Sequence, residues 1–292
     1  MKIEHGVSLA KLTTIGTGGP ARAFAQPATR DELEEALRWA SAEGLPVAVV
    51  GLGSNLLAAD DGVEALVLRL TGELASVDVV GTVLRAGGGA TNAVCLHAAR
   101  RAALGGLEFA CAIPGTAGGG VRMNAGAYGS DWSQILVRAL VVSADGAEWL
   151  TPAELGLSYR HSDLGPGQVV AEVEYELRPR PAEAIKEEVA DLIARRKATQ
   201  PTNKRTFGSV FKNPDGPMGA GRMLEACGLK GYRIGGAQIS PMHANFIENA
   251  GGATTADALA LMAEARRRAR QQFGVELHHE VQLLGSIGVD GT

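Results

Sequence analysis

The chain has 292 residues, of which 46% are hydrophobic and 21% are charged, and it carries a net charge of −4. These proportions are typical of a globular protein with room for two or three compact units, and they exclude a disordered or fibrous chain. The acidic balance argues against broad nucleic-acid binding, which needs a basic surface. No apolar run approaches the ~20 residues of a membrane span, and the N-terminus has no signal-peptide core. We therefore expect a cytoplasmic protein that binds neither nucleic acid nor membrane.

Only three cysteines are present, at Cys95, Cys111 and Cys227. An odd number without CxxC spacing argues against a disulfide framework and against a structural zinc site. We expect all three to be small buried apolar residues, and we expect no metal.

Helix and strand signals alternate over the first hundred residues. Thr29 and Glu32 form a capping-box pattern ahead of apolar residues at helical spacing, and Gly44 ends that helix. Residues 46–50 predict a buried strand. Further strands are expected near 65–70 and 82–86, and a helix over about 91–104.

The second half of the chain shows the same mixture. Asp145-Gly146 predicts a hairpin between strands 135–143 and 148–150, and Thr151-Pro152 predicts the start of a short helix. Alternation predicts a half-exposed strand over 169–177. Helices are expected over about 182–198, 221–227 and 255–273, with a closing strand over 275–284. Because no regular βαβ repeat is visible, the predicted class is α+β.

Six glycines lie between Ile113 and Gly129, and we call residues 113–129 the glycine block. Such a density indicates positive φ angles or close approach of bare backbone to a ligand. A flexible linker would lack the apolar residues that the block contains, such as Val121 and Met123. A ligand-binding loop is favoured, and a tight structural turn is the alternative.

A second glycine loop, Gly51-Leu52-Gly53, follows a predicted strand. It is weak evidence for a dinucleotide fold, because the sixth position of that fingerprint is Leu56 instead of glycine. Two loops that can aim N–H groups at phosphate fit a cofactor diphosphate held between two subdomains. Residues 192–214 contain no acidic residue but six cations: Arg195, Arg196, Lys197, Lys204, Arg205 and Lys212. Part of this is expected, because cations at a helix C-terminus complement the helix dipole. The cations beyond Gln200-Pro201 suggest a site for a small anion such as a diphosphate.

Seven motifs together resemble one family. They are Thr14-Ile15-Gly16-Thr17-Gly18-Gly19-Pro20-Ala21, Gly51-Leu52-Gly53-Ser54-Asn55-Leu56-Leu57, the glycine block, Leu157-Ser158-Tyr159-Arg160-His161-Ser162, Gly208-Ser209-Val210-Phe211-Lys212-Asn213-Pro214, Gly228-Leu229-Lys230-Gly231 and His279-Glu280-Val281. Over nearly its whole length the chain is similar to the UDP-N-acetylenolpyruvoylglucosamine reductase family, in its shorter subtype. Leu52 departs from the pattern, because that position often holds a smaller or polar residue.

The resemblance implies a two-subdomain FAD-binding fold of the vanillyl-alcohol-oxidase type, followed by a smaller α/β substrate domain. The implied bounds are 1–60 and 61–181 for the two FAD-binding subdomains and 182–292 for the substrate domain, with a last strand at 275–285 that can return to the FAD-binding part. It also implies non-covalent FAD, NADPH as reductant, and reduction of an enolpyruvyl ether of a UDP-sugar to UDP-N-acetylmuramate in peptidoglycan synthesis.

The resemblance further implies roles for single residues. Arg160 would hold the substrate carboxylate, Ser209 would donate a proton to the alpha carbon, and Glu280 would stabilise the enol form. The implied cofactor-binding residues are Gly51, Gly53, Ser54, Asn55, Leu56, Pro114, Gly115, Thr116, Gly118, Gly119, Asn124, Gly126 and Ala127. The implied substrate-binding residues are Tyr128, Tyr159, Lys212 and Asn213.

Two other functions are considered. A flavoprotein oxidase would need a base, which disagrees with a proton-donating Ser209, and a sugar-nucleotide binding module would not need the catalytic set. Without the family pattern, Ser209 would be interpreted as a turn residue, Arg160 as a surface loop arginine and Glu280 as an exposed strand carboxylate. His243 is expected to be structural.

Overall fold

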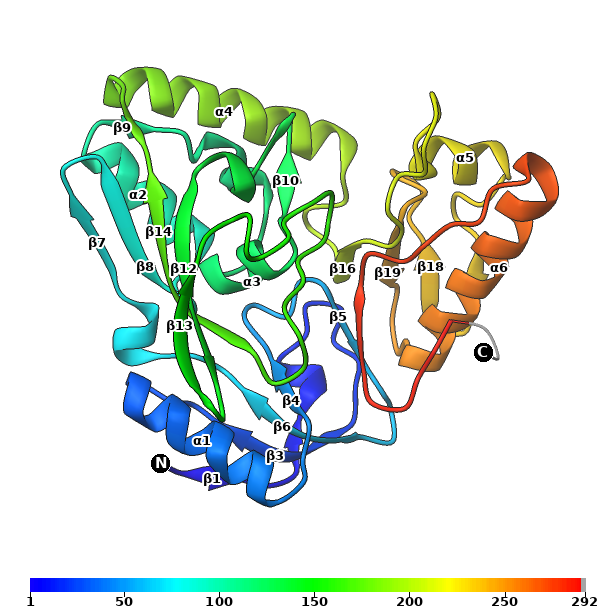
Figure 1. Ribbon diagram of the computed structural model, residues 1–292. Helices are drawn as coiled ribbons and strands as arrows, with labels where there is room; N and C mark the ends of the chain where they lie inside the picture. Colours follow the sequence, from blue (N-terminus) through cyan, green and yellow to red (C-terminus); the bar gives the residue numbers. More distant parts are fainter. Residues whose placement is uncertain (290–292) are drawn as a thin grey trace. The chain divides into compact units, whose positions relative to one another are not determined.

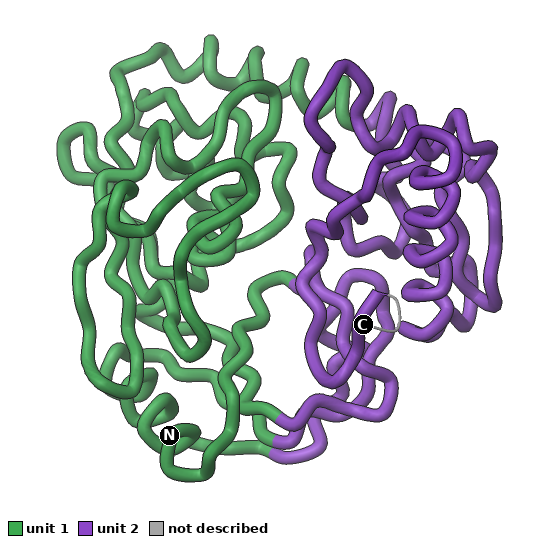
Figure 2. The backbone as a smooth tube through the Cα atoms, turned by 45° about the vertical axis from the view of Figure 1, so that its right-hand side comes forward, with its two compact units in different colours: residues 1–4, 23–52, 65–196 green, residues 5–22, 53–64, 197–292 purple. Residues whose placement is uncertain are grey.

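The computed structural model describes residues 1–289 and divides the chain into two compact units (Figure 1, Figure 2). Unit 1 contains residues 1–4, 23–52 and 65–196, and unit 2 contains residues 5–22, 53–64 and the described residues from 197 onward. The chain therefore passes between units after residues 4, 22, 52, 64 and 196. The three consecutive domains expected from the sequence do not coincide with these units, because 5–22 and 53–64 belong with the C-terminal segment.

The N-terminal sheet has the strand order β1-β3-β6-β4, with β2 paired to β3. Its strands are β1 (Ile3–Glu4), β2 (Val7–Ser8), β3 (Pro20–Ala25), β4 (Val47–Val49) and β6 (Val63–Leu68). Strand β4 is half-buried and not buried as predicted, because it is an edge strand paired only with β6.

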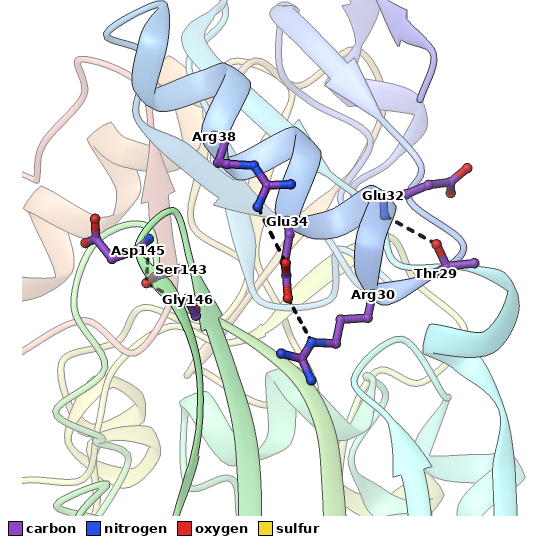
Figure 3. Close-up of polar contacts among 8 residues, drawn as sticks. All are labelled: Thr29, Arg30, Glu32, Glu34, Arg38, Ser143, Asp145 and Gly146. Carbon is purple, nitrogen blue, oxygen red and sulfur yellow. Dashed lines mark hydrogen bonds and ion pairs between the residues drawn. The ribbon is translucent and has the colours of Figure 1, made fainter.

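Helix α1 (Arg30–Ala42) confirms the capping prediction with one difference (Figure 3). Thr29 Oγ1 accepts a hydrogen bond from Glu32 N at 3.3 Å. The Glu32 carboxylate accepts from Ala28 N at 2.7 Å instead of from Thr29. The buried side of the helix packs against the strands of unit 1 through Leu33, Ala36, Leu37 and Ala40.

A second sheet of unit 1 has the order β13-β12-β14-β8-β7. Its strands are β7 (Val77–Val80), β8 (Val83–Gly87), β12 (Leu136–Ser143), β13 (Gly146–Leu150) and β14 (Val169–Glu176). The remaining elements of unit 1 are η2 (Gly72–Ala75), α2 (Asn92–Arg101), β9 (Leu104–Gly105), η3 (Glu108–Ala112), α3 (Ala117–Arg122), β10 (Gly126–Ala127), β11 (Ser130–Asp131), η4 (Trp132–Gln134), β15 (Arg178–Pro179) and most of α4 (Ala182–Thr199), whose residues 197–199 belong to unit 2.

The predicted hairpin joins β12 and β13, but its turn is shifted by one residue. Ser143 pairs with Gly146, so Ala144 and Asp145 are the turn residues, and Gly146 begins the returning strand. The Ser143 hydroxyl accepts from Asp145 N at 3.3 Å and donates to Gly146 O at 3.4 Å (Figure 3).

Two further predictions in unit 1 are wrong. Strand β14 is mostly buried and not half-exposed, because it lies between β12 and β8 in the middle of the sheet. Its Glu174 is compensated by Arg138 at 2.6 Å and Arg85 at 3.0 Å. The expected helix at Thr151 forms turns only. Leu155 N bonds to Thr151 O and Gly156 N bonds to Ala153 O, and Gly156 at φ +56 then leaves the helical backbone conformation.

Unit 2 is built on a sheet of order β16-β19-β18-β17, with helix α6 packed beside it (Figure 1). Its elements are η1 (Leu9–Lys11), β5 (Leu56–Ala58), β16 (Thr206–Ser209), α5 (Ala220–Ala226), β17 (Arg233–Ile234), β18 (Ala237–Ile239), β19 (Phe246–Asn249), α6 (Thr255–Phe273) and β20 (Gln282–Leu284). Helix α6 has the predicted bounds, with a capping box from Thr254 and Asp257 and a left-handed Gly274 at its end. Ile15 and Leu57 enter the core of this unit from the N-terminal segments.

The closing strand is shorter than predicted. Only Gln282–Leu284 forms β20, which pairs in parallel with β5, while residues 275–281 make no regular ladder. His279 makes an isolated bridge to Phe211 instead. Glu276, His278, His279 and Glu280 interrupt the apolar pattern over this stretch.

Of the three cysteines, only Cys95 is fully buried, and burial raises the pKa of its thiol to about 12. Cys111 and Cys227 are half-buried, so the expectation of three buried cysteines is wrong for these two, although burial raises the pKa of both. Among residues 1–289, no helix is both long and apolar enough to cross a membrane.

Candidate active site

The glycine block contains a short helix, α3. Two of the three glycines in this helix, Gly118 and Gly120, are required by packing. A Cβ atom on Gly120 would lie 2.7 Å from Trp132 Cε2, and one on Gly118 would lie 3.0 Å from the carbonyl oxygens of Gly88 and Val170. Trp132 is buried against Phe109 in an edge-to-face contact with ring centroids 4.8 Å apart. The structural-turn interpretation therefore applies to these two positions.

Gly115 and Gly119 are different, because no packed neighbour requires them to be glycine. The nearest atom to an added Cβ would be Asn92 Nδ2 at 3.5 Å for Gly115 and Thr116 Oγ1 at 3.4 Å for Gly119. Thr116 Oγ1 also accepts from Gly119 N at 3.4 Å as the N-cap of α3. Bare backbone without a packing reason is what a bound cofactor would explain, so the ligand hypothesis rests on these two glycines.

Asn92, which the sequence reasoning missed, anchors the start of the glycine block. Its main-chain N donates to Gly115 O at 3.0 Å, and its Nδ2 donates to Ile113 O at 2.9 Å. Within the described part of the chain, Asn92 Oδ1 is the one buried side-chain polar atom without a hydrogen-bond partner. The sequence feature that could have identified Asn92 is its position directly after Thr91, the N-cap of α2.

The two glycine loops meet at a cleft of about 250 Å³ in unit 1, which we call the glycine cleft. A Cβ on Gly51 would lie 2.8 Å from Thr116 Oγ1, so the loops are in direct contact. The sequence analysis did not predict part of this lining, although three consecutive glycines at 87–89 could have indicated a further ligand-binding loop. The missed lining residues include Arg69, Thr71, Gly88, Gly89 and Thr91. Bare backbone, threonine hydroxyls and one arginine fit the diphosphate of FAD.

The remaining part of the Gly51 loop belongs to unit 2. Gly53 has φ +67 and a built Cβ would lie 1.9 Å from Leu12 O, so packing explains this glycine. Asn55 Nδ2 donates to Glu280 O at 3.2 Å, and Asn55 O accepts from Gln282 N at 3.0 Å. Leu56 begins β5. In unit 2, therefore, this loop holds the C-terminal segment that carries Glu280.

Arg160 lies on a reverse turn between Ser158 and His161 and has φ +54. Its Nη2 donates to Gly126 O at 2.6 Å, and its guanidinium lies 5.0 Å from the Tyr159 ring centroid. Asn124, also at positive φ, donates from Nδ2 to Ser158 O at 2.9 Å. Positive φ in residues other than glycine marks backbone that the surrounding structure must hold in place.

Tyr128 is the third such residue, with φ +55, and it follows Ala127. Its hydroxyl donates to Leu192 O at 3.0 Å, and desolvation raises its pKa. Tyr128 lines a different and larger cavity of about 590 Å³, next to α4, where the predicted site residues do not gather. Tyr159 is 52% exposed. The substrate roles of both tyrosines remain predictions.

Ser209 lies at the end of β16, immediately after a β-bulge. Thr206 pairs with Glu248 and Ser209 with Phe246, so β16 has one more residue than β19 between the two pairs. Gly208 has φ +81, a conformation that glycine adopts without strain. The bulge re-aims Ser209, whereas the residue types alone suggested a turn.

Glu280 lies on the neighbouring segment in the same unit. Glu280 N donates to Val210 O at 2.8 Å, and Lys212 N donates to His278 O at 2.9 Å. These bonds place the two catalytic candidates Ser209 and Glu280 on adjacent stretches of chain. Arg160, the third candidate, belongs to unit 1.

Two other predictions concern polar residues around this pair. Asn213 Oδ1 accepts from Ala220 N at 3.0 Å and so caps α5, which gives Asn213 a structural role in addition to the predicted one. The six cations of segment 192–214 are divided, because Arg195 and Arg196 lie on α4 in unit 1 and the other four lie in unit 2. The three cations for which an anion site was expected, Lys204, Arg205 and Lys212, all belong to unit 2. Over residues 1–289, no group of three or more His, Cys, Asp or Glu residues could hold a metal ion.

Comparison with known proteins agrees with this arrangement. Residues 200–284 match the C-terminal domain of UDP-N-acetylenolpyruvoylglucosamine reductase, and residues 21–150 match an FAD binding domain. UDP-N-acetylenolpyruvoylglucosamine reductase 2 of Symbiobacterium thermophilum is 48% identical over 97% of this chain and 92% of that protein, and the reductase of Myxococcus xanthus is 42% identical over 98% and 93%.

A crystal structure of UDP-N-acetylenolpyruvylglucosamine reductase (MurB) from Thermus caldophilus superimposes with a TM-score of 0.85 at 38% identity. The match covers 97% of this chain and 99% of that one. The fold is therefore the α+β fold that the sequence motifs implied, with an FAD-binding part and a C-terminal part. The two matched domains, and the sequence identity to named reductases over nearly the whole chain, show that the chain belongs to the UDP-N-acetylenolpyruvoylglucosamine reductase family.

Proposed function

We propose that this enzyme reduces the enolpyruvyl ether of UDP-N-acetylglucosamine enolpyruvate to UDP-N-acetylmuramate, with NADPH as reductant, in the cytoplasmic stage of peptidoglycan synthesis. The observation that supports it most directly is the pairing of the Ser209 segment with the Glu280 segment, in a chain 48% identical to a named reductase over nearly its full length. When bound, FAD would supply the redox chemistry, which is hydride transfer from NADPH to the terminal methylene carbon. FAD would be held at the glycine cleft by Gly51 and Thr116, and by the bare backbone of Gly115 and Gly119 in the same loop as Thr116.

Arg160 is proposed to hold the substrate carboxylate. Hydride addition to the methylene carbon makes it a methyl group and moves negative charge onto the alpha carbon and the carboxylate. A guanidinium remains charged at any working pH and offers parallel N–H donors that match a carboxylate. The bond from Arg160 Nη2 to Gly126 O keeps this group oriented.

Ser209 is proposed to deliver the proton that completes the reduction at the alpha carbon. A serine hydroxyl is a weak acid in water, so it needs fixed placement against a strongly basic carbon. The bulge at Gly208 and the pairing with Phe246 provide that placement. The main-chain N of Glu280 is already bonded to Val210, so the proposed stabilisation of the enol form falls to its carboxyl group.

Binding of the UDP-sugar is proposed for Lys212, Asn213, Tyr128 and Tyr159. Lys212 follows Ser209 by three residues on the same ordered segment, and an ammonium group suits a diphosphate. The partners are thus small molecules, the substrate and NADPH. An oxidase would instead need a base to take a proton from its substrate, which a serine on this segment does not supply.

The test separates the two half-reactions by following the flavin colour anaerobically. Ser209→Ala should leave flavin reduction by NADPH within about twofold of wild type and slow reoxidation by the enolpyruvyl substrate by on the order of 10² to 10⁴. Ser143→Ala, at the end of β12, is the matched control and should change neither rate. Equal slowing of both half-reactions by Ser209→Ala would refute the role of Ser209, and a purified protein that takes up no FAD would refute the function.

A further inference from the structure

Asn245 is a buried asparagine that belongs to none of the proposed catalytic or binding sets. It is 4% exposed and directly precedes β19 in unit 2. Both ends of its side-chain amide bond to one residue: Oδ1 accepts from Phe211 N at 3.0 Å, and Nδ2 donates to Phe211 O at 2.8 Å. A buried polar side chain is stabilising only when its groups are satisfied, and here the amide is fully engaged in holding main chain.

The contacts of Asn245 continue the ladder at the point where regular pairing ends. Ser209 pairs with Phe246, and the next bond runs from Val210 N to Asn245 O at 2.9 Å. Asn245 directly precedes β19, and its side chain, in place of a further main-chain pair, bonds to the next residue, Phe211. The segment after Ser209 is therefore held by three consecutive bonds from a single residue.

The same segment also carries the other catalytic candidate. Phe211 bridges to His279, and Val210 O accepts from Glu280 N. A shift of the 209–211 main chain would consequently displace both the Ser209 hydroxyl and the Glu280 segment. Bulges end ladder pairing locally, so a bond across the next position is what prevents the strand from relaxing.

We infer that Asn245 is a positioning residue that fixes the direction of the Ser209 hydroxyl for proton delivery. This inference rests on the proposed function, because it assigns Asn245 to the proton-transfer step. Asn245 acts through the main chain of Val210 and Phe211 and touches no reacting atom. The position needs a donor and an acceptor at once, which an amide provides and a carboxylate does not.

Asn249 offers a matched control at the other end of β19. Its Nδ2 donates to Ile15 O at 3.0 Å, and its Oδ1 accepts from Gly251 N at 3.1 Å and Ala253 N at 3.2 Å. It is likewise a main-chain clamp with both ends engaged, but it lies away from the Ser209 segment. A purely structural effect should therefore appear in both variants.

The experiment compares Asn245→Asp, Asn249→Asp and Ser209→Ala in the FAD-loaded enzyme, with both half-reactions and the melting temperature measured. Asn245→Asp should slow the limiting rate of flavin reoxidation by substrate 10- to 100-fold, the range for a displaced reacting group. Its half-saturating substrate concentration and its flavin reduction by NADPH should stay within twofold of wild type. The solvent deuterium effect on reoxidation should increase, because proton transfer becomes more limiting. Asn249→Asp should lower the melting temperature comparably and leave both half-reactions within twofold.

Each alternative outcome has a defined meaning. If Ser209→Ala does not slow reoxidation, the proposed role of Ser209 fails. If Ser209→Ala slows it but Asn245→Asp does not, or if the two asparagine variants behave alike, the positioning inference fails. Asn245→Ser, which keeps a hydroxyl donor and acceptor, replaces the aspartate variant if that variant does not fold, and it should slow reoxidation by about tenfold.

Discussion

The glycine block of unit 1 and the Ser209 segment of unit 2 both place main chain for chemistry, by different means. In unit 1, Gly118 and Gly120 allow α3 to lie against neighbouring backbone and the Trp132 ring, and Arg160 and Tyr128 are held at positive φ. In unit 2, a bulged ladder and the Asn245 side chain hold the main chain by hydrogen bonds. The first arrangement is sensitive to added atoms, and the second is sensitive to the loss of a donor or acceptor.

Of the effects predicted here, the largest is expected for a substitution of the charged residue Arg160. Arg160→Lys keeps the positive charge and the Cβ atom at φ +54, so it tests the planar fork without changing the backbone strain. We expect reoxidation by substrate to slow by on the order of 10² while flavin reduction is unchanged. Arg38→Lys, on the surface of α1, is the control. Unchanged reoxidation in Arg160→Lys would mean that the guanidinium geometry does not matter.

Two glycine variants in the same helix, α3, test whether its glycines are required by packing. Gly120→Ala should destabilise the protein by about 2 kcal/mol in denaturant titrations, because the methyl group would meet the buried Trp132 ring, which cannot move aside. Gly119→Ala meets no packed atom closer than 3.4 Å and should leave stability unchanged, or raise it slightly through helix propensity.

The functional half of that pair is measured by FAD titration. Gly119→Ala should weaken FAD binding, because the added methyl group would cover bare backbone that is proposed to contact the cofactor. Normal FAD affinity in Gly119→Ala would place the cofactor elsewhere, and equal stability of the two variants would contradict the packing role of Gly120.

The smallest expected effect is on how the stability of unit 2 depends on pH. Arg267 and Arg268 hold the pKa of Glu264 on α6 at about 2, below its ordinary 4.5. A lowered pKa in the folded state gives stability that is complete above pH 4.5 and is lost as the pH falls toward 2. Because these pairs are partly exposed, Glu264→Gln should cost about 1 kcal/mol at pH 7. The difference from wild type should shrink between pH 4.5 and 2.

Signals that are local in sequence predicted the elements well. Helix α6 begins after a capping threonine and ends at Gly274, and both bounds agree with the structure. The predictions failed where burial depends on distant chain. Strand β14 alternates in sequence but is central in its sheet, and Glu174 is tolerated there because Arg85 and Arg138 come from neighbouring strands.

The candidate site shows the same division. The family motifs contain Arg160, Ser209 and Glu280, and motif matching needs no geometry to find them. Sequence could not separate Gly118 and Gly120 from Gly115 and Gly119, because the distinction depends on what lies beside each one. Nor could it predict that Asn55 and Asn245 would clamp the catalytic segments, since each bonds to residues far away in the chain.

The interleaving of the two units has a consequence for synthesis. All of unit 1 has been translated by residue 196, whereas residues 5–22 and 53–64 must wait for the C-terminal segment before the core around Ile15 and Leu57 can close. On the ribosome, the apolar residues of these early segments, such as Ile15 and Leu57, therefore stay exposed until the C-terminal segment is made. A fragment that starts at residue 200 would lack those segments, so the C-terminal segment that bears Ser209 and Glu280 should be handled only within the full-length chain.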